Sequence, residues 1–175
     1  LYFLRSDVET GVYNTAYQLV AVSLILPVSY FTALMPRLVG ALESDLPLAR
    51  RLMETSSRIM LSLGLPLAVG TGIVAGPLLR WLFPEAGGES VLPLQLLIWL
   101  AAISYWGQTF TNAAVVLDQG RIYMRLSLLG GVVNVIANLL VIPRYGYLGA
   151  CFTTLGTELL INGLFYVSVV KRTGK

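Results

Sequence analysis

The chain has 175 residues, of which 56% are hydrophobic and only 12% carry a charge. About a quarter of the residues of a soluble protein are charged, so this composition excludes an ordinary water-soluble domain and indicates a protein of the lipid bilayer. The chain contains no His and a single Cys, which excludes imidazole metal sites, Ser-His-Asp triads and an internal disulfide.

Residues 1–10 are short and mixed in charge, and we expect them to end a preceding helix or to form an outer loop. Five long segments with almost no charge then follow, each long enough to cross a hydrocarbon layer as a helix. They span residues 11–36, 59–79, 90–117, 126–143 and 145–170. Because a helix in water needs a polar face, we predict an all-α transmembrane bundle of about five spanning helices within residues 11–175.

The prolines of the first two predicted helices are expected to bend them. Pro27 stands near the middle of the first apolar segment, where it removes a backbone hydrogen bond and favours a kink. Pro66 and Pro77 stand in the second, among several glycines. The chain begins at Leu1 and shows no secretory signal, so we interpret it as a fragment of a longer protein.

The segment 41–58, between the first two predicted helices, differs from the rest. Apolar residues such as Leu42, Leu46 and Leu52 alternate with charged ones such as Glu43 and Arg50. This pattern is typical of a short amphipathic helix lying on the cytoplasmic interface. An ordinary solvated connector is the alternative.

The Lys and Arg residues predict the orientation of the chain, because cytoplasmic loops carry an excess of them. Nine follow the first, third and fifth apolar segments, whereas Arg5, Arg80 and Arg144 stand singly in the other loops. We therefore expect the N-terminus outside and the C-terminus in the cytoplasm. Topology also explains the net charge of +3, so we expect no nucleic-acid partner.

Polar side chains recur at helical spacing on the last three predicted helices, so that each helix has one polar face. Within lipid such side chains face protein or a hydrated cavity. The candidates for a substrate or transport cavity are Gln108 and Asn112, then Asn134 and Asn138, then Thr154, Glu158 and Asn162. Amides also commonly hold membrane helices together, which is the alternative for the Asn and Gln residues.

Glu158 is the only ionisable residue well inside a predicted helix. An intramembrane carboxylate suggests a proton or cation site, or a partner for a substrate hydroxyl or cationic group. The alternative is a protonated or hydrogen-bonded Glu that holds helices together, with Asn134 or Asn138 as examples of a partner.

Three arginines stand at predicted cytoplasmic helix ends, namely Arg37, Arg121 and Arg125. Their guanidinium groups would attract the phosphates of a lipid head group, although the positive-inside rule places arginines there in any case. No pair of membrane-depth carboxylates, metal-ligand cluster or phosphate-binding loop is found. We therefore expect no enzyme, no catalytic residue, no metal and no cofactor.

Two stretches carry a resemblance to a known family. One is Gly11-x-Tyr13-x-x-Ala16 with its ending Pro36-x-Leu38. The other comprises Asn134-x-x-x-Asn138, the turn Pro143-x-Tyr145-Gly146-x-x-Gly149-Ala150, and then Thr153, Thr154 and Glu158. Their order resembles the polysaccharide transporters, including the Wzx-type O-antigen flippases, of the multidrug/oligosaccharidyl-lipid/polysaccharide (MOP) exporter superfamily. The resemblance covers nearly the whole chain.

That resemblance implies two six-helix lobes around a central cavity, with this chain as most of the second lobe. It implies alternating access that flips lipid-linked, undecaprenyl-type oligosaccharides across the bacterial cytoplasmic membrane for cell-envelope polysaccharide biosynthesis. The partners implied are membrane lipid, this substrate and the remaining half of the transporter. A cation-coupled multidrug exporter of the same superfamily, a membrane-embedded glycan transferase and a purely structural membrane subunit remain open as alternatives.

Overall fold

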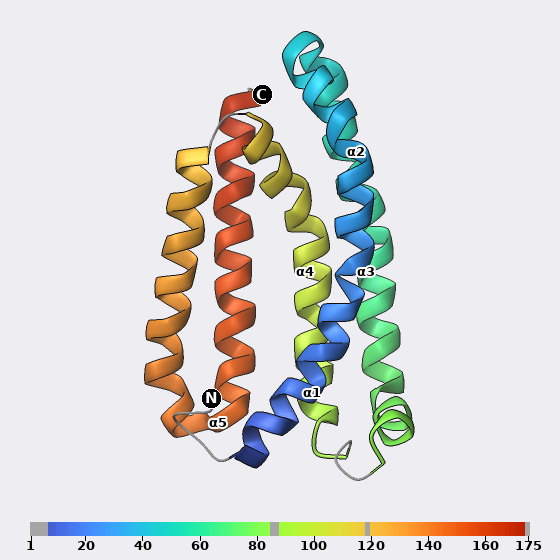
Figure 1. The fold of residues 1–175 in the computed structure, drawn as a ribbon, viewed down its shortest axis with the longest axis vertical. Helices are drawn as coiled ribbons and strands as arrows, with labels where there is room; N and C mark the ends of the chain where they lie inside the picture. The colour runs from blue at the N-terminus through green and yellow to red at the C-terminus, as the bar shows by residue number, and fades with distance from the viewer. Residues whose placement is uncertain (1–6, 85–87, 118–119, 174–175) are drawn as a thin grey trace.

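The computed structural model describes residues 7–84, 88–117 and 120–173. Every regular element there is a helix, in the order α1 (Asp7–Ser23), α2 (Ile25–Ser44), α3 (Leu46–Leu82), α4 (Val91–Val116) and α5 (Gly120–Thr173). The predicted helical bundle is confirmed (Figure 1). Within these described ranges, four stretches are long and apolar enough to cross a bilayer, and the first of them joins α1 to α2. Most of the expected N-terminal segment, residues 1–6, lies outside the described residues.

α5 turns back on itself and supplies two crossings. At Gly146 the backbone has φ 59° and ψ −141°, a conformation that essentially only glycine adopts. The turn predicted over residues 143–149 is therefore confirmed. The first arm of α5, residues 120–145, and the second arm, residues 147–173, run side by side in opposite directions (Figure 1). With this turn the described residues contain five long apolar helical segments, as the sequence predicts.

The first crossing is kinked where Pro27 predicts it. α1 ends at Ser23 and α2 begins at Ile25, with Pro27 as the third residue of α2. Proline has no N–H to donate to the carbonyl four residues earlier, and its ring crowds that carbonyl. The helix axis therefore changes direction here, as Figure 1 shows. Pro66 and Pro77, by contrast, lie within the single long helix α3.

The amphipathic segment 41–58 does not form a helix of its own, in contrast to the prediction. Its first residues end α2, and the rest begin α3. Asp45 separates the two helices, because its side chain accepts a 3.0 Å hydrogen bond from the backbone N–H of Leu48 and caps α3. Pro47 stands in the first turn of α3, where proline is tolerated, and no further proline follows before Pro66. The amphipathic stretch therefore continues directly into the second crossing.

α4 lies at the centre and contacts all four other helices. Leu94, Leu97, Ile98 and Tyr105 are almost completely buried in a core shared mainly with α1, α2 and α3. A helix surrounded in this way carries its polar side chains inside the bundle, and Ser104 and Thr109 are indeed buried. α4 thus determines which polar groups meet in the interior.

The helix ends fall into two groups that match the alternation of basic residues. The α2–α3 junction, the end of α4, the start of α5 and the end of α5 lie at one end of the bundle (Figure 1). The start of α1, the end of α3, the start of α4 and the Gly146 turn lie at the other end. The basic-rich loops of the sequence therefore share one end. We call this the basic end.

Candidate functional site

A carboxylate-centred cluster lies between α4 and the second arm of α5. Ser104 of α4 donates a 2.8 Å hydrogen bond to Glu158 Oε1, and Asn162 donates a 3.0 Å hydrogen bond to the same oxygen. Glu158 is half-buried, whereas Ser104 and Asn162 are buried. The structure thus brings together two of the predicted residues, Glu158 and Asn162, and adds Ser104, which the sequence did not single out.

The local sequence explains why these groups meet. Thr154, Glu158 and Asn162 are four residues apart and therefore share one face of the second arm. Opposite them on α4, Gly107 provides the room for the amide of Asn162. A Cβ built on Gly107 would lie 1.9 Å from Asn162 Oδ1. A glycine thus lets the two helices approach closely enough for Glu158 to reach Ser104.

Glu158 opens onto a small pocket of about 180 Å³ between α4 and both arms of α5. Hydroxyl, amide and carboxylate groups dominate its lining, which comprises Ser104, Gln108, Thr111, Tyr123, Ser127, Glu158, Ile161, Asn162 and Phe165. A polar space of this size suits a few waters or a hydrated ion rather than a sugar chain. Among the residues that the structure describes, no group of three His, Cys, Asp or Glu side chains lies close enough together to bind a metal ion.

Gln108 connects this pocket with a larger one. Asn112 donates a 3.0 Å hydrogen bond to Gln108 Oε1, so the two side-chain amides form one hydrogen-bonded pair. Both residues line a pocket of about 490 Å³ between α2 and α4, whose other walls are Val28, Phe31, Thr32, Met35 and Pro36. Because Gln108 belongs to both pockets, they adjoin on one side of α4.

Asn134 and Asn138 form a separate seam between the two arms of α5. Asn138 donates a 2.8 Å hydrogen bond to Asn134 Oδ1, and Thr153 donates to Asn138 Oδ1. Asn134 reaches Thr157 at 3.4 Å. The hydrogen bonds in the described part of the chain do not join Glu158 to either asparagine. Glu158 therefore does not pair with Asn134 or Asn138, but its hydrogen bond from Ser104 joins α4 to α5, so the helix-joining alternative stays open with another partner.

The remaining candidates lie apart from the Glu158 cluster. Thr154 is 3.4 Å from the hydroxyl of Tyr13 and so joins the second arm to α1. Arg37, Arg121 and Arg125 are all exposed, and none of them lines a pocket described here. Their interaction with a lipid phosphate stays a prediction.

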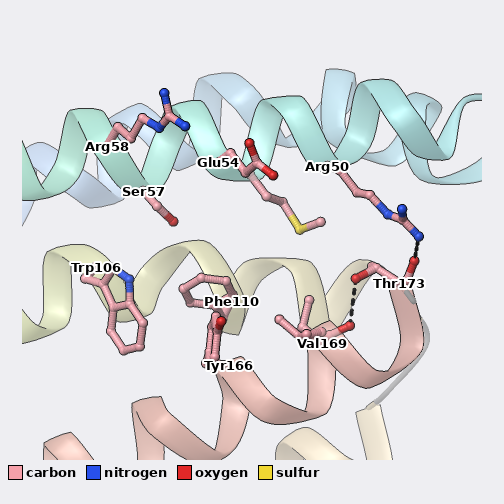
Figure 2. Close-up of a pocket in the computed structure, with 11 residues that line it drawn as sticks. Arg50, Glu54, Ser57, Arg58, Trp106, Phe110, Tyr166, Val169 and Thr173 are labelled. Atoms are coloured by element: carbon pink, nitrogen blue, oxygen red, sulfur yellow. Dashed lines mark hydrogen bonds between the residues drawn. The ribbon is translucent and has the colours of Figure 1, made fainter. Parts of the chain in front are cut away.

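A further pocket, of about 530 Å³, was not expected from the sequence. It lies near the basic end between α3 and the second arm of α5, with α4 behind it (Figure 2). Arg50, Glu54 and Arg58 contribute from α3, and Trp106 and Tyr166 face them from the opposite side. The four-residue spacing of the charged side chains was visible in the sequence. The sequence did not show that the second arm of α5 packs opposite them.

The chain is similar in sequence to a protein named probable flippase AglR from Haloferax volcanii. The two are 25% identical over 156 residues, which cover 87% of this chain and 33% of the relative. The chain thus spans about a third of that protein's length. No family model matches the chain, and no solved structure does either. The chain is a polytopic helical membrane bundle with a distant likeness to this archaeal protein.

Proposed function

We propose that the chain is part of a flippase, a membrane transporter that moves lipid-linked oligosaccharides across the cytoplasmic membrane. Three independent features support this proposal. They are the distant similarity to a probable flippase, the ordered resemblance to polysaccharide transporters described above, and a polar interior surface within an otherwise apolar bundle. The first is archaeal, so the proposal covers prokaryotic envelopes in general, with bacterial O-antigen precursors as one substrate class.

The observation that carries the proposal is the Glu158 cluster. Placing a carboxylate among membrane helices is costly unless it is hydrogen-bonded or protonated. Here Ser104 and Asn162 donate to it, while one side of the cluster opens onto a polar pocket. A carboxylate whose only role is to hold two helices together would not need to open onto such a pocket. We therefore assign Glu158 to binding a coupling proton or cation beside the transport path.

The larger pocket between α2 and α4 is suited to the substrate head group. Gln108 and Asn112 present amide donors and acceptors there, which match the hydroxyl groups of a sugar. Phe31 and Met35 supply apolar surface. Alternating access would then open this side of α4 to each face of the membrane in turn, with the kink before Pro27 as the bending point. The other lobe of the transporter would complete the cavity.

Glu158→Gln tests this function in the full-length transporter, in a host whose own flippase has been deleted. Glutamine keeps an oxygen that accepts the hydrogen bonds of Ser104 and Asn162, so the protein should insert and accumulate normally. Export of the lipid-linked oligosaccharide should fall strongly, because the side chain no longer binds a proton or cation. Glu89→Gln is the matched control, since Glu89 is exposed near the α3–α4 connection. Normal export by Glu158→Gln would refute the coupling role of Glu158, whereas absence of export by the wild-type protein would refute the flippase function.

A cation-coupled multidrug exporter is a second candidate, favoured by the small pocket at Glu158. Its carboxylate, amide and hydroxyl oxygens are the ligands that hard cations prefer. Retention of fluorescent cationic dyes separates the two functions. An exporter should lower dye retention in a Glu158-dependent manner, whereas a flippase should leave it unchanged.

A further inference from the structure

The pocket between α3 and the second arm of α5 is separate from the proposed transport surface. It shares no residue with the two pockets that meet at Gln108. Figure 2 shows Ser57 pointing from α3 toward the aromatic side chains of α4 and α5, and Arg50 extending toward Thr173 at the end of α5. Transport as proposed above does not require this pocket, so its composition needs another explanation.

One wall of the pocket is cationic and incompletely paired. Arg50, Glu54 and Arg58 follow one another at four-residue steps along α3, which gives the wall a surplus of one positive charge. Within the described part of the chain, Glu54 forms no ion pair with either arginine. Arg50 donates through Nη2 to the backbone carbonyl of Thr173 at the end of α5. This contact positions its guanidinium group beside the pocket.

Two buried polar atoms on this wall have no hydrogen-bond partner among the described residues. They are Nε of Arg50 and Oγ of Ser57. Buried polar groups in proteins are nearly always hydrogen-bonded, because an unpaired one loses its bonds to water without replacement. An N–H donor and a hydroxyl on one face of α3 together match a ligand that supplies acceptor oxygens. The positive surplus of the wall favours an anionic ligand.

The opposite wall is apolar and aromatic. The rings of Phe110 and Tyr166 meet edge to face at 4.9 Å, and Trp106 lies 5.1 Å from Phe110 and 5.6 Å from Tyr166. Val169 and Val170 extend this surface along α5. A soluble anion would leave such a wall unused, and a purely hydrocarbon ligand would leave the donors unpaired. The pocket therefore matches an amphipathic anion.

We propose that this pocket binds one anionic glycerophospholipid of the bilayer leaflet at the basic end. Its phosphate accepts hydrogen bonds from Arg50, an ester carbonyl of its glycerol backbone accepts from Ser57, Arg58 adds positive charge to the same wall, and an acyl chain covers Trp106 and Tyr166. Basic pockets between membrane helices are known sites for acidic lipid head groups. The proposal depends on the membrane-spanning fold and not on which substrate is transported.

Quenching of Trp106 fluorescence by brominated lipids tests the proposal directly. The chain has three tryptophans, and Trp81 and Trp99 are 78% and 45% exposed. Replacing both by Phe leaves Trp106 as the single reporter. The protein is reconstituted in phosphatidylcholine vesicles that contain either acyl-brominated phosphatidylglycerol or acyl-brominated phosphatidylcholine. We expect Trp106 to be quenched at a much lower fraction of the anionic lipid than of the neutral one.

Arg58→Gln should remove much of this preference and lower the apparent affinity for phosphatidylglycerol by clearly more than the about fivefold effect of any basic residue near an acidic membrane surface. Arg58 is exposed and lines the pocket, so its replacement should leave the fold intact, as circular dichroism can check. Arg50→Gln should act similarly but also loses its bond to Thr173. Arg37→Gln, an exposed arginine outside this pocket, is the matched control.

Three results would overturn the proposal. Equal quenching by the two brominated lipids would show that the pocket does not select an anion. An equal loss in Arg37→Gln and Arg58→Gln would show a diffuse charge effect in place of a site. Absence of quenching by either lipid would show that lipid does not reach Trp106 and that the pocket is not a lipid site.

Discussion

Tyr105 of α4 donates a 2.6 Å hydrogen bond to the backbone carbonyl of Ser23. In a regular helix that carbonyl would accept from the N–H of residue 27, which is a proline and has none. The tyrosine hydroxyl therefore replaces the missing backbone donor. The kink between α1 and α2 is thus tied to the central helix of the bundle.

We expect Tyr105→Phe to destabilise the protein by about 1 kcal/mol, the usual magnitude for a hydrogen bond between membrane helices. Tyr105 is only 2% exposed, so water cannot replace the lost hydroxyl. The measurement is the thermal unfolding midpoint in lipid nanodiscs. Tyr145→Phe, at a residue that is 67% exposed, should change nothing.

The Pro27→Ala background makes this test specific. Alanine supplies the N–H that the carbonyl of Ser23 lacks. Tyr105→Phe should therefore lower the stability of the folded protein less in that background than in the wild type. The difference between the two costs is the coupling energy of a double-mutant cycle. Equal costs would mean that Tyr105 stabilises the protein through packing alone.

We expect Gly107→Ala to destabilise the bundle by about 1–3 kcal/mol, the range for overpacking a tight contact. The new methyl group would overlap the amide of Asn162 and displace it from Glu158. Adding Asn162→Ala should recover part of the thermal stability while export stays low.

Gly156→Ala on the neighbouring helix α5 is the control for Gly107→Ala. A Cβ there meets no described atom within 4 Å, and alanine is favoured over glycine in helices by about 1 kcal/mol. Its thermal midpoint should stay the same or rise. A loss of stability in Gly156→Ala as large as that in Gly107→Ala would show that the loss comes from reduced helix flexibility and not from the contact with Asn162.

Gly146→Ala should weaken the turn of α5 by about 1–3 kcal/mol, because a side chain strains a backbone with φ 59°. The added Cβ would also lie 2.6 Å from Glu9 Oε2. The same thermal assay measures the effect. Gly131→Ala, where no described atom lies within 4 Å of the added Cβ, should be close to neutral. Similar midpoints for the two variants would contradict this account of the turn.

The orientation predicts a pattern of chemical labelling. Arg51→Cys and Lys171→Cys at the basic end should be shielded from a membrane-impermeant maleimide in intact cells, whereas Arg144→Cys should react. All three positions are exposed. The native Cys151 is buried and is replaced by Ala to leave one thiol in each variant. Reaction of Lys171→Cys but not Arg144→Cys in intact cells would reverse the proposed topology.

The sequence predicted the crossings well because hydropathy is a property of contiguous residues. A run without charge, such as residues 90–117, indicates a spanning helix whatever its neighbours are. The kink at Pro27 and the turn at Gly146 were also predictable, because they depend on local backbone chemistry. The structure has no separate interfacial helix over residues 41–58, because Asp45 caps α3 within this segment. The amphipathic pattern of the sequence does not show that helix boundary.

The polar contacts needed the tertiary structure. Asn134 and Glu158 both lie on predicted polar stripes, yet Asn134 joins the two arms of α5 while Glu158 accepts from Ser104 of α4. Likewise, the arginines of α3 were visible in the chain, but Trp106 and Tyr166 opposite them were not. Periodicity determines the face of a helix on which a side chain lies. Its partner depends on the rotation and depth of the neighbouring helix, which only the packed bundle decides.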